Sequence, residues 1–466
     1  MSLQIFLVAA GKGTRMRSDK PKVLHEIGGQ AMLRRVYNTA CGLRPACIHI
    51  VYGFGGDQIR ASMSDLKNVD WVYQAEQLGT GHAVRQAMPN VKYDDIVLVI
   101  YGDTPLLSVT TLGRMVAAVP DGGLAVLTAN FSDPTGFGRI VRDSAGAFDR
   151  IVEQKDASPE ELKIHEINTG VCVADAGVLR TMLNTIGRDN AQHEYYLTDV
   201  FSIARRCGMP VVTVTADDPE EVLGVNSCLQ QAKVEKIYQR KVAEKLMTDG
   251  VTIIDPDRIN IRGNLTCGRD VVIDINAVFI GDVVLGDRVT VGPNCVLKDC
   301  EIGTDSVISP CTVIEGSKLG RHVTIGPFAR LRPGCELKDE VHVGNFVECK
   351  NATLGEGTKS GHLTYLGDAT LGRGVNIGAG TITCNYDGLH KFKTVIGDDV
   401  FVGSDTQIVA PVTVGDGVTI GAGTTVTKDI SDDMLVITRA PRRDIPDWKR
   451  PGKKDRAPKQ PEDKQE

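Results

Sequence analysis

The chain has 466 residues, of which 42% are apolar, and its formal net charge is −6. At roughly 150 residues per domain, this length suggests two or three domains with full cores. The mild acidity gives no reason to expect nucleic acid or an anionic membrane as a partner.

The sequence favours a cytoplasmic protein. Its twelve cysteines are scattered, without a Cys-x-x-Cys pair or zinc-ligand spacing, so we expect reduced thiols and no disulfide framework. Residues 3–10 lack a preceding basic residue and run into Gly11-Lys12-Gly13, which is typical of a buried strand and not of a signal peptide. No apolar run approaches the roughly 20 residues that span a bilayer.

The first part of the chain, residues 1–227, alternates short aliphatic segments with amphipathic ones. This alternation is typical of a Rossmann-like α/β domain with a mostly parallel sheet, in which ligands bind beyond the carboxyl ends of the strands. We therefore expect a site in the loops after Ala9 and Tyr101. The predicted strands are 5–9, 48–52, 69–73, 96–101 and 124–128, and predicted helices include 32–41 and 110–119.

Residues 228–249 are charged and nearly free of glycine, which predicts a linker helix between two domains. The tail, residues 441–466, is proline-rich and charged without apolar periodicity, so we expect it to be disordered. The apolar residues expected on one face of the linker helix are Leu229, Ala232, Ile237, Val242, Leu246 and Met247.

Residues 250–440 carry a repeat of six residues, which fits neither a helix nor a simple alternating strand. We interpret it as a parallel β-helix of hexapeptide repeats, in which three hexapeptides make one triangular coil and each aliphatic side chain points inward. Ordinary strands with glycine turns would explain one or two repeats, but the pattern recurs across most of this region. The most regular positions are Ile396, Val402, Ile408, Val414, Ile420 and Val426.

The loop after the first strand reads Gly11-Lys12-Gly13-Thr14-Arg15-Met16 and is followed by Pro21-Lys22. Its glycines let the backbone approach a ligand closely, and its bases suit a polyphosphate. The order of residues is not that of a Walker A loop, and Met16 replaces the third glycine of the dinucleotide fingerprint. The motif resembles the signature of the sugar nucleotidyltransferases, which join a sugar 1-phosphate to a nucleoside triphosphate.

This resemblance implies a role for each matching residue. Arg15 and Lys22 would neutralise phosphate charge during catalysis, and Asp103 and Asn226 would hold Mg²⁺, a hard cation that prefers oxygen ligands. Lys22, Asp103 and Asn226 would also contact UTP or the UDP-sugar. The further contacts implied for that ligand are Leu7, Ala9, Ala10, Gly11, Gln74, Gly79, Thr80, Tyr101, Gly102, Gly138, Glu153 and Asn168.

The six-residue period is interrupted at 358–369 and at 381–394, and insertions in solenoids tend to carry the binding face. The first interruption holds Gly361-His362-Leu363-Thr364-Tyr365 and the second holds Cys384-Asn385-Tyr386-Asp387-Gly388. With the N-terminal motif, these stretches resemble the bacterial bifunctional N-acetylglucosamine-1-phosphate uridylyltransferase/glucosamine-1-phosphate acetyltransferases. The resemblance runs from about residue 3 to residue 440.

That family implies a left-handed β-helix with acetyltransferase activity, which forms a homotrimer and serves cell-wall and lipopolysaccharide synthesis. His362 would be the general base, because imidazole can accept a proton from an amine near neutral pH. Residues implied to hold the acetyl acceptor are Arg332, Lys350, Tyr365 and Asn376. Those implied to contact acetyl-CoA are Ala379, Asn385, Tyr386, Ser404, Ala422 and Arg439.

Two other interpretations are weaker. The chain could be a nucleotidyltransferase whose solenoid only assembles or regulates it, but His362 with Lys350 and Tyr365 argues against that. It could be a non-catalytic subunit with decayed sites, which the intact Arg15 and Lys22 argue against.

Overall fold

The computed structural model describes residues 2–450 and divides into two compact units, residues up to Pro333 and residues from Gly334 onward, which we describe separately. Of the predicted tail, residues 451–466 lie outside the described residues, and 441–450 contain no helix or strand. The twelve cysteines are all free thiols.

The predicted α/β fold is confirmed in the first unit. Its main sheet has the strand order β11-β7-β10-β6-β1-β4-β5, and β10 is antiparallel to both of its neighbours while the other pairs along this path are parallel. The five predicted strands lie within two residues of their expected bounds. The strands are β1 Leu3–Ala9, β4 Cys47–Tyr52, β5 Val69–Tyr73, β6 Ile96–Tyr101, β7 Leu124–Asn130, β8 Gly138–Arg142, β9 Phe148–Val152, β10 Glu166–Asp175 and β11 Val211–Thr215, with a small ribbon of β2 Glu26–Ile27 and β3 Gln30–Ala31.

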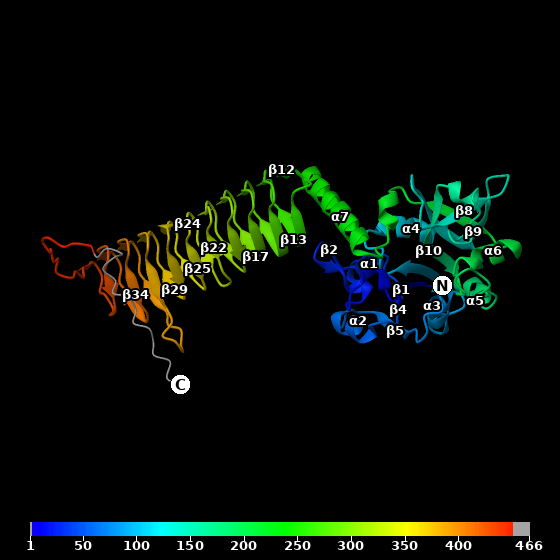
Figure 1. Cartoon of the computed structure of the whole chain (residues 1–466), viewed down its shortest axis with the longest axis horizontal. Coiled ribbons are helices and arrows are strands. Elements are labelled where there is room, and N and C mark those ends of the chain that lie inside the picture. Colours follow the sequence, from blue (N-terminus) through cyan, green and yellow to red (C-terminus); the bar gives the residue numbers. More distant parts are fainter. Residues whose placement is uncertain (1, 451–466) are drawn as a thin grey trace, which may run out of the picture. The chain divides into compact units, whose positions relative to one another are not determined.

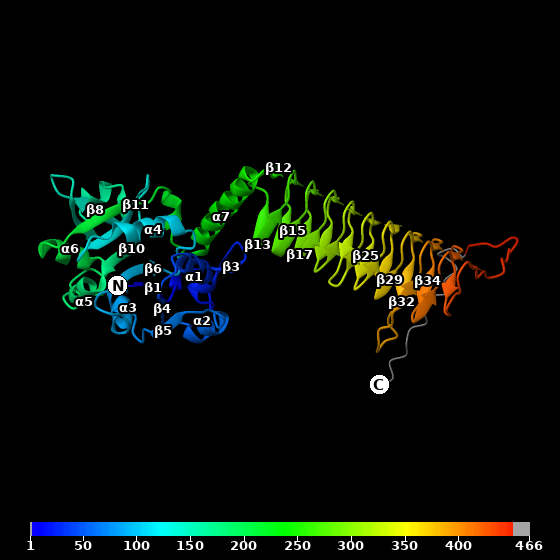
Figure 2. The ribbon, with the colours of Figure 1, turned by 180° about the vertical axis from the view of Figure 1, so that it is seen from behind.

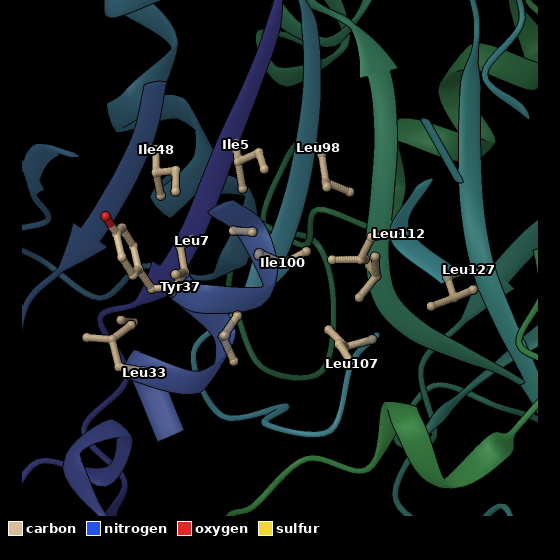
Figure 3. Packing of buried hydrophobic residues seen from close by; sticks show 14 of the residues in the cluster. Ile5, Leu7, Leu33, Tyr37, Ile48, Leu98, Ile100, Leu107, Leu112 and Leu127 are labelled. Atoms are coloured by element: carbon tan, nitrogen blue, oxygen red, sulfur yellow. The ribbon is translucent and has the colours of Figure 1, made fainter. Parts of the chain in front are cut away.

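Helices cover both faces of this sheet (Figure 1). Because side chains alternate along a strand, Ile5 and Leu7 of β1 pack on one face while Phe6 between them packs on the other. Figure 3 shows Ile5 and Leu7 beside Ile100 of β6 and Leu33 of a covering helix. Burying each such side chain contributes roughly 1.5–3 kcal/mol. The helices are α1 Met32–Gly42, α2 Gly56–Ser62, α3 Thr80–Ala87, α4 Val109–Ala118, α5 Ala176–Leu183 and α6 Asp199–Arg206.

The linker helix α7 spans Cys228–Thr248, and the Ser227 side chain caps it by accepting a hydrogen bond from the Gln230 amide. The prediction that Leu229 belongs to a buried apolar face of α7 is wrong, because Leu229 is 82% exposed. The buried seam contains Gln239, whose side chain donates to the Ile261 carbonyl and accepts from the Ile261 amide. These polar contacts tie the helix to the first coils of the solenoid, and an apolar pattern does not reveal them.

The predicted parallel β-solenoid is confirmed, and Figure 2 shows β13, β15 and β17 stacked side by side in the first unit. In the second unit, Ile396 pairs with Val414 and Val402 with Ile420, so each aliphatic residue stacks on its counterpart one coil away. All six of the most regular repeat positions are buried. The solenoid strands of the first unit are β12 Thr252–Ile253, β13 Asn260–Cys267, β14 Val272–Ile273, β15 Val278–Leu285, β16 Thr290–Val291, β17 Val296–Ile302, β18 Val307–Ile308, β19 Val313–Glu315, β20 Lys318–Leu319, β21 Thr324–Ile325 and β22 Arg330–Leu331.

The second unit continues this pattern without a break at 358–369, so the first predicted interruption is wrong. Ser360 pairs with Val343 in one neighbouring coil and with Ile377 in the other, and it is fully buried. A hydroxyl side chain thus fills an inward position that an aliphatic residue usually fills. The strands of this unit are β23 Glu336–Leu337, β24 His342–Asn345, β25 Glu348–Lys350, β26 Thr353–Leu354, β27 Lys359–His362, β28 Tyr365–Gly367, β29 Ala369–Leu371, β30 Asn376–Ile377, β31 Ile382–Cys384, β32 Thr394–Ile396, β33 Phe401–Val402, β34 Gln407–Val409, β35 Val412–Val414, β36 Thr419–Ile420, β37 Thr425–Val426 and β38 Leu435–Val436.

The second predicted interruption is a real insertion. The chain leaves the coil after β31 and rejoins it at Thr394, the first residue of β32. Between these points the Tyr386–Lys391 bridge and a hydrogen bond from the Phe392 amide to the Asn385 carbonyl (2.9 Å) close a short antiparallel loop. Leu389 at its tip is 84% exposed, so the loop projects from the coil.

Candidate functional sites

The first candidate site is a cavity of about 950 Å³ at the carboxyl ends of the parallel strands. Loops after β1, β5 and β6 form its walls, as expected for an open α/β sheet. The predicted residues that line it are Ala9, Ala10, Gly11, Lys22, Gln74, Gly79, Thr80, Tyr101 and Asp103.

Lys22 lies at the centre of the charged end of this cavity. Its ammonium group donates to Asp103 Oδ2 and, at 2.9 Å, to Asn226 Oδ1. Gly13 permits this arrangement, because it has a positive φ of 60° and an added Cβ would lie 2.7 Å from the Lys22 Cβ. The side chains of Lys22 and Asp103 are only 13% and 17% exposed, so the ion pair is partly shielded from water.

The two oxygens that contact Lys22 also fit a divalent cation. The oxygens of Asp103 and Asn226 converge on one point, the Lys22 ammonium, although the two residues are far apart in sequence. One carboxylate and one amide oxygen suit Mg²⁺, which keeps several waters and takes further ligands from substrate phosphates. Among residues 2–450 no cluster of three or more His, Cys, Asp or Glu side chains offers a closed metal cage.

The part of the cavity wall that follows β5 makes partly buried hydrogen bonds. Gln74 is 2% exposed, and its amide lies 2.9 Å from His82 Nδ1. Gly79 has φ 114°, and a Cβ there would lie 2.5 Å from the Tyr195 carbonyl oxygen. Thr80 Oγ1 accepts from the Leu197 amide at 3.1 Å. These contacts connect the residues after β5 to the segment around Tyr195 and Leu197.

Gly138 on β8, Asn168 on β10 and Glu153, which directly follows β9, come together. Asn168 pairs with Gly138, and a Cβ on Gly138 would lie 3.3 Å from Glu153 Oε2. Burial raises the pKa of Glu153, although a hydrogen bond from Thr198 acts in the opposite direction. None of these three residues lines the cavity described above, but together they present a carboxyl group that can exchange hydrogen bonds with hydroxyl groups.

Other predicted residues have different surroundings. The Leu7 side chain is fully buried in the core beneath Gly102, and Arg15 is exposed in the short 3-10 helix Thr14–Met16. Glu194 lines the cavity but was not predicted, because it follows no recognisable motif.

The second candidate site lies along one corner of the solenoid coils of the second unit. His362 ends β27, and Leu363, with φ 48°, turns the chain into β28. His362 Nδ1 lies 2.9 Å from Asn345 Oδ1, and Asn345 is the residue paired with His362 in the preceding coil. His362 is exposed, so its other ring nitrogen is accessible.

The register of the strands places predicted acetyl-CoA residues in one column with His362. The Gly380 amide donates to the Leu363 carbonyl, which sets Ala379 beside His362 in the next coil. The Asp405 amide donates to the Ala379 carbonyl at 2.7 Å, so Ser404 follows in the coil after that.

The same column continues through Ala422 to Arg439. The Gly423 amide donates to the Ser404 carbonyl at 2.8 Å, and Arg439 donates to the Ala422 carbonyl. At about 4.8 Å per coil, the distance from His362 to Ala422 is roughly 14 Å. Three small side chains therefore form a straight strip that leads away from an imidazole, and a cation lies at its far end.

Of the residues predicted to hold the acetyl acceptor, Lys350 and Tyr365 are on β25 and β28, which follow the corner, whereas Asn376 is on β30, which precedes it. Lys350 pairs with Gly367, and Tyr365 lies over Gly367, because a Cβ there would be 2.3 Å from the tyrosine oxygen. Asn376 is on β30, half-buried between neighbouring coils. Arg332 belongs to the first unit, next to β22.

A carboxylate that was not predicted, Asp368, joins several of these residues. It accepts hydrogen bonds from Asn351 (2.7 Å) and Asn385 (2.5 Å), and it lies 3.6 Å from the Lys350 ammonium. Asn385 is 7% exposed at the base of the inserted loop, while Tyr386 next to it is 60% exposed. Asn351, Asp368 and Asn385 are each separated by 17 residues, the length of one coil here, so they lie side by side in successive coils. This spacing is the sequence signal that predicts their contact.

Comparison with known protein families finds a match in each half of the chain. Residues 5–159 match the model of the MobA-like NTP transferase domain, and residues 264–299 and 393–428 match that of the bacterial transferase hexapeptide (six repeats). Together with the fold, these matches define a transferase in which a nucleotidyltransferase domain is joined to acyltransferase-like repeats. Within residues 2–450, we find no helix with both the length and the apolarity needed to cross a membrane.

Proposed function

We propose that the chain is a bifunctional enzyme of UDP-N-acetylglucosamine biosynthesis. The solenoid transfers an acetyl group from acetyl-CoA to glucosamine 1-phosphate, and the α/β domain then couples N-acetylglucosamine 1-phosphate to UTP and releases pyrophosphate. The observation that carries the proposal is the column from His362 through Ala379, Ser404 and Ala422 to Arg439, which lies in the same chain as a nucleotidyltransferase cavity.

In uridylyl transfer, a phosphate oxygen of the sugar attacks the α-phosphorus of UTP, and the bond to the pyrophosphate oxygen breaks. Two anions must approach in line, so the protein has to neutralise and orient them. Lys22 projects into the cavity from behind Gly13, and the glycine-rich loop offers backbone amides to the phosphates. The Gln74 wall would hold the base, and Glu153 and Asn168 would bind the sugar.

Mg²⁺ fits this chemistry, and Asp103 and Asn226 are the residues that would hold it. When bound, the ion neutralises phosphate charge that develops as pyrophosphate leaves. Lys22 would then be free to pair with the phosphates, because its present partners are the same two oxygens.

In acetyl transfer, the amine of the sugar attacks the thioester carbonyl, the carbon–sulfur bond breaks, and coenzyme A leaves as a thiol. His362 can accept the amine proton through Nε2, because Nδ1–H donates to Asn345 Oδ1 and fixes the neutral tautomer. The strip of small residues gives an extended pantetheine arm a path along the corner. Lys350 would pair with the sugar phosphate.

Hexapeptide β-solenoid proteins often form trimers, and we propose a homotrimer in the cytoplasm.

One assay tests both halves of the proposal. The protein is incubated with glucosamine 1-phosphate, acetyl-CoA, UTP and Mg²⁺, and free thiol and pyrophosphate are measured separately. Both products are expected. Absence of thiol would refute the acetyl-transfer half, and thiol without pyrophosphate would refute the uridylyl-transfer half.

Replacing His362 with Ala is expected to reduce thiol release at least a hundredfold, because general-base catalysis contributes typically 10²–10⁴-fold. Pyrophosphate release from UTP and N-acetylglucosamine 1-phosphate should be unchanged. The control is His322→Asn, because His322 is an exposed solenoid histidine near Asp305 and asparagine tolerates its positive φ of 56°. Equal loss of both activities in the His362 variant would indicate a folding role and contradict the assignment.

A further inference from the structure

We propose that Asp368 is a positioning residue with two partners. It fixes Lys350, the cation of the acetyl-acceptor site, and Asn385, the residue at the base of the inserted loop on the acetyl-donor side. This inference rests on the proposed acetyltransferase activity for its substrates. Its structural basis is the set of contacts that Asp368 makes to two neighbouring coils and to both ends of the insertion.

Asp368 holds the inserted loop where it leaves the coil and where it returns. Its carboxylate accepts a hydrogen bond from the Asn385 side chain at 2.5 Å, and its carbonyl accepts one from the Thr394 amide at 3.1 Å. Tyr386 follows Asn385 directly and is largely exposed. Asp368 in the preceding coil therefore contacts the loop at both of its ends.

The same carboxylate lies 3.6 Å from the Lys350 ammonium, and the Asp368 amide donates to the Lys350 carbonyl at 3.0 Å. The side chains of Lys350 and Asp368 are 20% and 14% exposed, so their attraction is only partly screened. Asn351 donates to the second carboxylate oxygen at 2.7 Å and fixes the rotamer. The Asp368 carboxylate therefore lies beside Lys350, which is proposed to bind the sugar phosphate, and also binds Asn385 at the base of the inserted loop.

The carboxylate has the charge that this role requires. Burial would raise the pKa of Asp368, but hydrogen bonds from Asn351 and Asn385 and the nearby charges of Lys350 and Lys391 hold it below its usual value. Asp368 is therefore ionised throughout the neutral range.

Asp368 lies at a left-handed corner, with φ 50°, so alanine there would add backbone strain. Asparagine tolerates that conformation and removes only the charge and one of the two acceptor oxygens. The test variant is therefore Asp368→Asn. Asp399→Asn is the control, because Asp399 is another left-handed corner residue of the same unit, with φ 54°, and unlike Asp368 it is exposed.

We expect Asp368→Asn to raise KM for both glucosamine 1-phosphate and acetyl-CoA about tenfold, with a smaller change in kcat and unchanged uridylyl transfer. The control should stay within twofold of the wild type. In a Lys350→Met background the effect on the acceptor KM should disappear, and in an Asn385→Ala background the effect on the acetyl-CoA KM should disappear. Unchanged KM values, or full effects in both backgrounds, would overturn the proposal.

A second measurement needs no activity. Trypsin should cut the full-length Asp368→Asn protein after Lys391 or Lys393 at least fivefold faster than the wild type or the control, because one carboxamide oxygen must replace the two oxygens that now face Asn351, Asn385 and Lys350, which weakens the base of the loop. Equal cleavage rates would refute the positioning role. A wild-type protein that releases no thiol would instead refute the proposed acetyltransferase, so the two failures can be distinguished.

Discussion

Lys22 gives the sharpest test of the nucleotidyltransferase site. Its ammonium contacts Asp103 and Asn226, and the side chain is only 13% exposed. Methionine is similar in length and shape and lacks the charge. Replacing Lys22 with Met should therefore leave the fold intact and remove one cation from the phosphate-binding end of the cavity.

The size of the effect follows from the contact that is lost. A hydrogen bond to a charged group contributes about 1.5–3 kcal/mol, and each 1.4 kcal/mol changes a rate tenfold. Uridylyl transfer at saturating Mg²⁺ should therefore have a kcat/KM lower by about tenfold to a hundredfold. Affinity of the nucleotide-free protein for Mn²⁺, measured by electron paramagnetic resonance, should rise, because Asp103 and Asn226 no longer bind an ammonium.

The assay follows pyrophosphate release from UTP and N-acetylglucosamine 1-phosphate. The control is Lys20→Met, because Lys20 is an exposed lysine two positions away whose ammonium lies 3.5 Å from a Glu26 oxygen. Acetyl transfer by the same preparations checks that the chain is folded. A kcat/KM for uridylyl transfer within twofold of the wild type, or unchanged Mn²⁺ affinity, would refute the role assigned to Lys22.

Two further predictions concern the same domain. Gly79→Ala should lower the melting temperature and raise KM for UTP about tenfold, because alanine is incompatible with the φ of 114° and its Cβ would lie 2.5 Å from the Tyr195 oxygen. The control is Gly122→Ala, which should not change KM, because Gly122 also has a positive φ but no atom lies within 4 Å of an added Cβ. Because burial raises the pKa of Glu153, its contribution to the free energy of unfolding is full below the ordinary pKa and declines as the pH rises through the folded value. Glu153→Gln should therefore raise the melting temperature at pH 7 but not at pH 4 while it lowers uridylyl transfer, and equal shifts at both pH values would contradict this.

The strands of the α/β domain could be predicted from sequence because each is a short aliphatic run bounded by polar residues. The solenoid could be predicted because Ile396, Val402 and their successors recur every six residues. The supposed interruption at 358–369 was wrong for a physical reason. Buried hydroxyls replace aliphatic residues there, and Thr358 satisfies its hydroxyl by donating to the Gly372 carbonyl at 2.8 Å. Periodicity of hydrophobicity cannot detect such positions.

The site residues were predictable to different degrees. Lys22 and Asp103 belong to motifs with a recognisable order, so sequence alone could assign both to one site, although it did not predict the ion pair between them. Asn345 and Asp368 belong to no motif, and their roles depend on which residues lie beside them in adjacent coils. Once 358–369 is counted as a regular coil, the 17-residue register places both beside residues that were predicted.

The position of the insertion explains how the solenoid accommodates a projecting loop without disturbing the corner column. Asn376 pairs with Phe401, a separation of 25 residues, whereas the preceding coil pairs Lys359 with Asn376 at 17. The additional residues all lie between Cys384 and Thr394, after Ala379 and before Ser404. Because stacking depends on pairing between strands and not on the length of chain between them, Ser404 still lies next to Ala379. The same additional residues inserted between Asn376 and Ala379 would move Ala379 out of the column. Because the loop instead follows Ala379, its side chains project from the coil while the column from His362 to Ala422 stays straight.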